Sequence, residues 1–222
     1  MRINPETIAF ITDLAANNDR DWFAAHRSRY DEALENVKAF GESLVSRMNR
    51  ADDIERHRHY RIYRDVRFSK DKTPYNPRFG ISLMRRKPHL RGSYFVDIEP
   101  AQTRVVVGFW GPNSADLALI RDHIDHEGDR FREVVENPEL KLVYDRLSGD
   151  ALKTAPRGYR QDHPHIDLLR HKQFLFRTSF TPAETLAPAF LEDLVFALSA
   201  IRPFFDHMSD VLAHDENGVR LY

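Results

Sequence analysis

Apolar residues recur at helical spacing through most of the first fifty positions. A short helix is expected to begin at Asn4-Pro5 and to end at Asn17-Asn18, where turn-forming residues interrupt the pattern. A longer helix is expected from about Asp19 to about Asn49. Its apolar face consists of Trp22, Phe23, Tyr30, Ala33, Val37, Phe40, Leu44 and Met48. Because stripes with this spacing are usually buried, we interpret this face as part of the core.

The pattern then changes to runs of β-branched and aromatic residues, which favour strands. Three such runs, at residues 79–84, 94–98 and 104–110, are joined by short links that contain turn-forming residues. Short links join antiparallel neighbours more easily than parallel ones, so an antiparallel meander is predicted over about residues 78–111. A further strand is expected at about residues 173–180.

Helices are expected between the meander and the last strand. One helix starts after a cap at Asn113 or Ser114. Short helices are expected between Phe131 and Leu152, with breaks at Asn137-Pro138 and Ser148-Gly149.

The last helical region begins with the residues of a capping box, Thr181 to Glu184, with Pro182 at the first helical position. Pro203 is expected to kink or end the helix that follows. The apolar residues of that helix, which should make it central, are Leu186, Phe190, Leu194, Leu198 and Ile201.

These elements predict an α+β fold, in which an antiparallel β-sheet packs with several helices and long helices lie near the N- and C-termini. Of the 222 residues, 41% are apolar and 30% are charged, which suits one large compact domain. No repeat or linker divides the chain, so a single domain over residues 1–222 is expected. No apolar run is long enough to cross a bilayer and the start lacks the apolar centre of a signal peptide, so a cytoplasmic protein without membrane contact is expected.

The composition excludes several kinds of chemistry. The chain has no cysteine, which rules out disulfides, thiolate catalysis and metal sites built on thiolates. Histidines occur in pairs at His57/His59, His123/His126 and His163/His165, but such spacings are weak signals of metal binding. We therefore predict no metal and no cofactor. The chain also lacks the sequence motifs that mark common hydrolase, metalloprotease and nucleotide-binding folds.

Positive charge is concentrated in one window of a nearly neutral chain. Residues 56–91 hold twelve Lys/Arg and only two acids, Asp65 and Asp71, so this window has a net charge of +10 while the whole chain has −1. A local excess of this kind attracts anions. With a pI near 6.8, a basic coat over the whole domain is not expected, although a local nucleic-acid-binding patch stays open.

The centre of this window, Arg61 to Tyr75, is the strongest candidate site. Arginine suits phosphate or carboxylate because its planar fork donates two hydrogen bonds at once. We favour an extended conformation over a helix here, with Asp65 holding an arginine in place and having its pKa lowered by that contact. Tyr75 offers a ring for stacking. The expected anion contacts are Arg61, Arg64, Arg67, Lys70 and Lys72, with Asp71 shaping the loop.

The run Arg61-x-x-Arg64-Asp65-x-Arg67-Phe68, continued by Asp71, Lys72 and Tyr75, resembles the mainly bacterial, uncharacterised family known as domain of unknown function 2461. Further similarity is found at Asn17 to Phe23, at Tyr94 to Pro100 and at Pro156 to Lys172. The family implies no activity. The resemblance does suggest that the polar segments converge on one concave site, which would add Arg20, Trp22, Arg157 and Tyr159 as ligand contacts.

Three functions remain open from the sequence. The leading hypothesis is a site for a small phosphorylated or other anionic ligand, with or without catalysis, in which His163 or Asp71 would handle a proton. The second is a nucleic-acid-binding module that uses Tyr60, Tyr63 and Tyr75 as stacking platforms. The third is a structural or interaction protein whose Arg/Asp motif forms internal salt bridges.

Overall fold

The computed structural model describes residues 1–214 and 219, and it confirms the α+β class. A five-stranded antiparallel sheet has the strand order β1-β2-β3-β4-β5, so each strand pairs with its neighbour in sequence. The strands are β1 (Ile54–His59), β2 (Phe79–Arg85), β3 (Ser93–Ile98), β4 (Thr103–Phe109) and β5 (Phe174–Phe180). The helices are α1 (Pro5–Ala16), α2 (Arg20–Ala25), α3 (Arg27–Met48), α4 (Ser114–Val135), α5 (Pro138–Lys141), α6 (Ile166–Leu169), α7 (Pro182–Leu186), α8 (Phe190–Ala200) and α9 (Arg202–Val211).

Four of the five strands follow the predicted pattern, whereas β1 does not. Its sequence is mostly charged and only Ile54 is buried. An edge strand needs few apolar residues, and charged side chains protect it from pairing with other molecules. Hydrophobic alternation therefore carries no signal for β1.

The chain divides into two compact units, and strands β2 to β5 contribute residues to both. The first unit comprises Met1–Leu83, Phe95–Val105 and Ser179–Phe196. The second comprises Met84–Tyr94, Val106–Thr178 and the described residues from Ala197 onward. The expectation of one domain over residues 1–222 stays a prediction.

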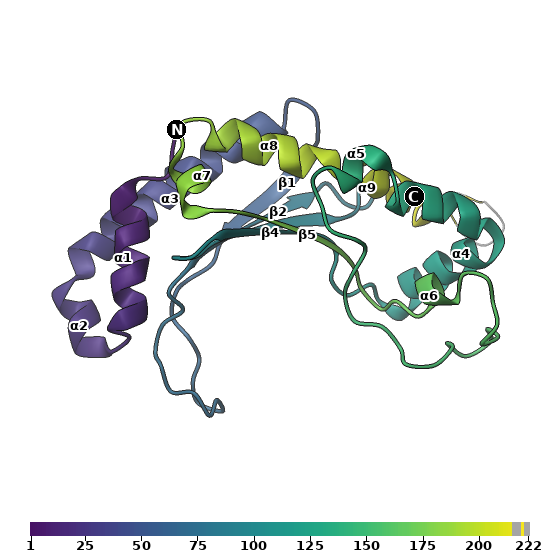
Figure 1. Cartoon of the computed structure of the whole chain (residues 1–222), viewed down its shortest axis with the longest axis horizontal. Helices are drawn as coiled ribbons and strands as arrows, with labels where there is room; N and C mark the ends of the chain where they lie inside the picture. Colours follow the sequence, from purple (N-terminus) through teal and green to yellow (C-terminus); the bar gives the residue numbers. More distant parts are fainter. Residues whose placement is uncertain (215–218, 220–222) are drawn as a thin grey trace. The chain divides into compact units, whose positions relative to one another are not determined.

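In the first unit, α1 lies beside α3 (Figure 1). The long helix expected from Asp19 to Asn49 is wrong in one respect, because it is broken at His26 into α2 and α3. His26 has a non-helical φ of −114° and ψ of 21°, and its ring stacks on Trp22 with centroids 4.1 Å apart. The apolar stripe of α3 is buried as predicted, and Phe40 stacks on Phe190 of α8.

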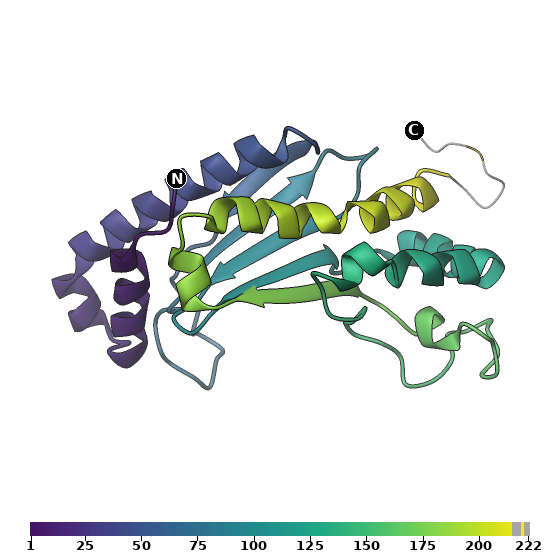
Figure 2. The same ribbon diagram turned by 45° about the horizontal axis from the view of Figure 1, so that its top comes forward.

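In the second unit, α4 lies beside α9 (Figure 2). Asn113 caps α4, since its side chain accepts a hydrogen bond from the Asp116 N–H at 2.9 Å. The prediction of short helices between Phe131 and Leu152 is wrong at both ends. Phe131 belongs to the 22-residue α4, and the chain after α5 is not helical because Ser148 pairs with Leu175 beside β5.

The predicted capping box at Thr181 is confirmed, and Glu184 completes it. The single helix expected from Leu186 to Ile201 is wrong in one respect, because Leu186 belongs to the separate α7, whereas α8 ends shortly before Pro203 as expected. Pro188 explains the first break, since a residue before proline avoids helical angles and Ala187 is extended with a ψ of 146°. Pro203 lies in the first turn of α9, just after α8 has ended. Within the described part of the chain, every helix is too short or too polar to cross a bilayer.

Candidate functional site

The predicted basic segment forms a hairpin between β1 and β2, which we call the basic hairpin (residues 60–78). Figure 1 shows it as a long loop that projects beyond the sheet. Its two arms pair near the base, where Arg64 and Asn76 donate backbone N–H groups to the carbonyls of Pro74 and Ile62 at 2.9 and 2.7 Å. The segment is thus non-helical, as favoured from the sequence, and turns back at Arg67.

The basic hairpin is anchored to the N-terminal helices at Tyr75. The Asn18 side chain donates to the Tyr75 carbonyl at 2.9 Å and accepts from its N–H at 3.1 Å. The Phe23 ring of α2 stacks on the Tyr75 ring with centroids 4.3 Å apart. The N-terminal polar segment and the basic motif therefore meet in the first unit, as the sequence suggested.

Most charged residues at the tip of the hairpin bind one another. Arg64 donates to Asp71 at 2.6 Å, and Arg67 binds both oxygens of Asp65 at 2.9 and 2.6 Å. Lys72 Nζ donates to the Val66 carbonyl at 3.0 Å. These three cations hold the loop together through contacts within it.

Both acids of the tip have lowered pKa values. The Thr73 backbone N–H, the Arg64 guanidinium and the Thr73 hydroxyl lower the pKa of Asp71 to about 2. The Arg67 side chain and backbone N–H lower the pKa of Asp65, which confirms the predicted sign. An acid with the pKa of Asp71 stays ionised at neutral pH and suits an orienting role better than proton transfer.

Three other predicted cations are not paired in this way. Arg20, Arg61 and Lys70 have no carboxylate or hydrogen-bond partner among the residues that the structure describes. Their side chains are exposed. The charge of Arg20 lowers the pKa of Tyr75, and the charge of Arg61 lowers that of Tyr30. Lys70, in contrast, lies in the tip of the hairpin.

The base of the hairpin brings three tyrosines together with three arginines. We call this group the tyrosine–arginine cluster, and it consists of Arg20, Arg27, Tyr30, Arg61, Tyr63 and Tyr75. The Tyr63 ring lies 6.4 Å from that of Tyr30 and 5.5 Å from that of Tyr75, between centroids. Arg27 donates to the Tyr63 hydroxyl at 3.2 Å, and its guanidinium lies 5.3 Å from the centroid of the Tyr30 ring.

The charges of the arginines act on the pKa values of the tyrosines. Burial raises the pKa of Tyr30, Tyr63 adds to this, and the charges of Arg27 and Arg61 oppose it. Burial likewise raises the pKa of Tyr75, with a further increase from Tyr63 and a decrease from Arg20 and Arg27. Within the described residues, the hydroxyls of Tyr30 and Tyr75 form no hydrogen bond. The cluster therefore combines unused donors with positive charge.

The sequence did not identify Tyr30 and Arg27 as candidates. Tyr30 has the spacing of the apolar stripe in α3, and its ring is indeed buried there. Arg27 lies one turn earlier and pairs with Asp31, as many exposed helical arginines do. The only local signal was the spacing of three residues between Arg27 and Tyr30, which places them on one helix face.

The remaining predicted residues lie in the second unit. His163 uses both ring nitrogens, because Nε2 contacts Asp125 at 3.0 Å and Nδ1 accepts from the His165 N–H at 3.1 Å. Burial raises the pKa of Tyr159, and the carboxylates of Asp125 and Asp122 add to the increase. Arg157 is exposed at a turn. The expected convergence of these residues with the basic hairpin stays a prediction.

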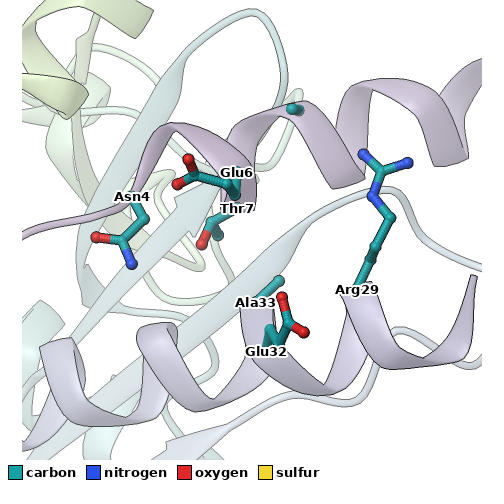
Figure 3. Close-up of a pocket in the computed structure, with 7 residues that line it drawn as sticks. Asn4, Glu6, Thr7, Arg29, Glu32 and Ala33 are labelled. Atoms are coloured by element: carbon teal, nitrogen blue, oxygen red, sulfur yellow. The ribbon is translucent and has the colours of Figure 1, made fainter.

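Two further features bear on other kinds of site. A hollow of about 380 Å³ between α1 and α3 is lined by Asn4, Thr7 and Arg29 among others (Figure 3). Several of its polar groups are already used, because the Asn4 backbone N–H and the Thr7 hydroxyl donate to Asn36 and Arg29 binds Asp13. Over residues 1–214 and 219, no three histidines or carboxylates are arranged to hold a metal ion.

Trp22 contributes to the site through packing. Its ring is half-buried, stacks on His26 and lies 6.2 Å from the Phe10 ring, between centroids. It therefore supports α2, whose first residue is Arg20 and whose Phe23 holds Tyr75.

Comparison with known proteins identifies a family. Residues 6–207 match the family model described as "Conserved hypothetical protein (DUF2461)". The chain therefore belongs to the family DUF2461, as its motif suggested. No curated protein and no solved structure matches it. The family description states no activity, so the functional argument rests on the site.

Proposed function

We propose that this member of the DUF2461 family binds a small anionic ligand, such as a phosphate ester, at the tyrosine–arginine cluster. One observation carries the proposal: Arg61 and Arg20 have no partner in the described residues, and their charges lower the pKa values of Tyr30 and Tyr75, whose hydroxyls also lack a partner. Arg64, Arg67 and Lys72 of the tip, in contrast, are occupied by Asp71, Asp65 and a backbone carbonyl.

The chemistry of the cluster suits an anion with several oxygens. Guanidinium groups donate paired hydrogen bonds to phosphate or carboxylate, and phenols add single donors. Burial raises the pKa values of Tyr30 and Tyr75, so both phenols are protonated at neutral pH and act as donors. A protonated phenol cannot act as a base and its raised pKa makes it a weaker acid, so the cluster favours binding over proton transfer.

Arg27 is held in place for this role. It donates from Nε to both oxygens of Asp31, at 2.9 and 3.1 Å, which leaves Nη1 directed to the Tyr63 hydroxyl. An arginine that is already oriented loses less entropy when it binds a ligand. Arg61 then supplies a charge that no carboxylate of the described residues neutralises.

A thermal-shift titration with inorganic phosphate and pyrophosphate tests the proposal. At a ligand concentration about ten times Kd, binding stabilises the folded state by about 1.4 kcal/mol. For a chain of this length, that raises the melting temperature by about 3–5 °C. The Arg61→Gln variant should lose most of this increase while melting at an unchanged temperature without ligand.

Arg67→Gln is the matched control, since it removes an arginine from the same hairpin that already binds Asp65. It should keep the phosphate-dependent increase. Loss of the increase in both variants would indicate a diffuse charge effect and would refute the cluster as the site. The absence of any increase in the unmodified protein, with both phosphate and pyrophosphate, would refute binding of these anions.

A further inference from the structure

The tip of the basic hairpin displays an aromatic ring to solvent. Phe68 is 97% exposed, although its neighbours in the tip are tied together by internal contacts. Arg67 is fixed by Asp65, and Lys72 bridges to the Val66 carbonyl. A large apolar side chain on an ordered loop is costly in water and gains free energy when a partner covers it.

Further exposed groups lie on β1, close to the start of the hairpin. Arg58 lies 5.1 Å from the centroid of the Tyr60 ring, so both side chains project to one side of the strand. Arg56 is two residues before Arg58 and projects to the same side of the strand. His59 projects to the opposite side and packs against Gly41 of α3, so closely that a Cβ added to this glycine would lie 2.4 Å from the His59 ring. Tyr60 is 42% exposed.

These groups share a chemical pattern. Arg56, Arg58 and Lys70 have no carboxylate partner among the residues that the structure describes. The rings of Tyr60 and Phe68 lie among them in the sequence and are both exposed. We call this set the hairpin track: Arg56, Arg58, Tyr60, Phe68 and Lys70.

We infer that the hairpin track binds single-stranded nucleic acid. Unpaired bases stack on exposed aromatic rings, and the repeating phosphates bind cations spaced along the protein. This partner uses both the ring at the tip and the cations at the base. An anionic membrane would meet only Phe68 and Lys70 at the tip, which is a weak anchor.

The hairpin track differs from the arrangement expected from the sequence. Tyr75 is only 6% exposed and is covered by Phe23, so it offers no face for a base. Phe68, which the sequence did not single out as a platform, takes that role. The track shares no residue with the tyrosine–arginine cluster, so each binding activity can fail without the other.

Fluorescence anisotropy with labelled oligo-dT and oligo-U of about 15 nucleotides tests the inference in low salt. The unmodified protein should bind at least one of them, and the difference between the two distinguishes DNA from RNA. Phe68→Ala should weaken binding by about tenfold, because stacking of one base is lost. Phe196→Ala is the control, since this ring is also largely exposed, at 68%, but lies on α8.

The salt dependence supplies a second measurement. Replacing both Arg56 and Arg58 by Gln should reduce the slope of log affinity against log salt by about 1.4, since each phosphate contact to a single strand contributes about 0.7. The melting temperature of each variant checks that the fold is kept.

Two results would overturn the inference. One is that neither oligonucleotide binds in low salt. This result overturns the inference even if vesicles containing phosphatidylserine bind through Phe68. The other is equal loss of affinity in Phe68→Ala and Phe196→Ala, which would show that the tip has no special role.

Discussion

The tip and the base of the basic hairpin contain similar residues but use them differently. At the tip, Arg64 and Arg67 are each paired with an aspartate and the loop is closed by its own contacts. At the base, Arg61 has no partner among the described residues, and it lies near the buried ring of Tyr30. The comparison teaches that density of charge does not by itself mark a binding site. Groups whose hydrogen bonds and charge are not yet used are the better indicator.

The largest expected effect is a loss of stability when the contact between Asn18 and the basic hairpin is removed. Asn18→Ala removes two hydrogen bonds to the Tyr75 backbone and leaves both backbone groups partly buried. We expect a loss of about 2 kcal/mol in the free energy of unfolding, measured by urea denaturation. The Asn17→Ala control removes one exposed hydrogen bond to the Asp13 carbonyl and should cost less than half as much. Equal losses would show that the base of the hairpin is not specially anchored.

Removal of the Tyr30 hydroxyl should have an intermediate effect, which falls on phosphate affinity and not on stability. Tyr30→Phe removes a donor that has no partner in the described residues, so the free energy of unfolding should change by less than about 0.5 kcal/mol. Affinity for phosphate should fall by about tenfold, because a hydrogen bond to a charged ligand is lost. Calorimetric titration measures this change. A large loss of stability with unchanged affinity would instead assign Tyr30 to the core alone.

Protonation of Asp71 at the tip gives the smallest expected effect, because it changes the stability of the folded state only far below neutral pH. The pKa of Asp71 falls from 3.8 to about 2, so its stabilising contacts are fully present above pH 3.8 and are lost only as pH falls through about 2. NMR titration of the Asp71 carboxyl carbon should therefore show a midpoint near 2. A midpoint near 3.8 would mean that the contacts with Arg64 and Thr73 are not formed in solution.

The sequence predicted the parts of this site that depend on local chemistry. The extended form of the basic segment followed from its β-branched residues and turn formers, and the role of Asp65 followed from its position among arginines. The capping box at Thr181 was likewise readable from residue types alone. In each case the residues that interact are close in sequence.

The sequence did not predict features that depend on distant contacts or weak patterns. Tyr30 has the same spacing as the core residues of α3, so only its position beside Tyr63 distinguishes it. The pairing of Arg64 with Asp71 rather than Asp65 depends on where the loop turns. Strand β1 is held by its neighbour β2 and has little apolar character of its own.

The central claim is that anions bind to the unpaired arginines at the base of the hairpin and not to the paired ones at its tip. Its most direct test is an NMR titration with inorganic phosphate that follows the Nε–H signal of each arginine side chain. The signals of Arg20 and Arg61 should shift with one common saturation curve, while those of Arg64 and Arg67, which are paired with aspartates, should stay in place. Shifts confined to Arg64 and Arg67 would contradict the claim, as would arginine signals that do not respond to phosphate.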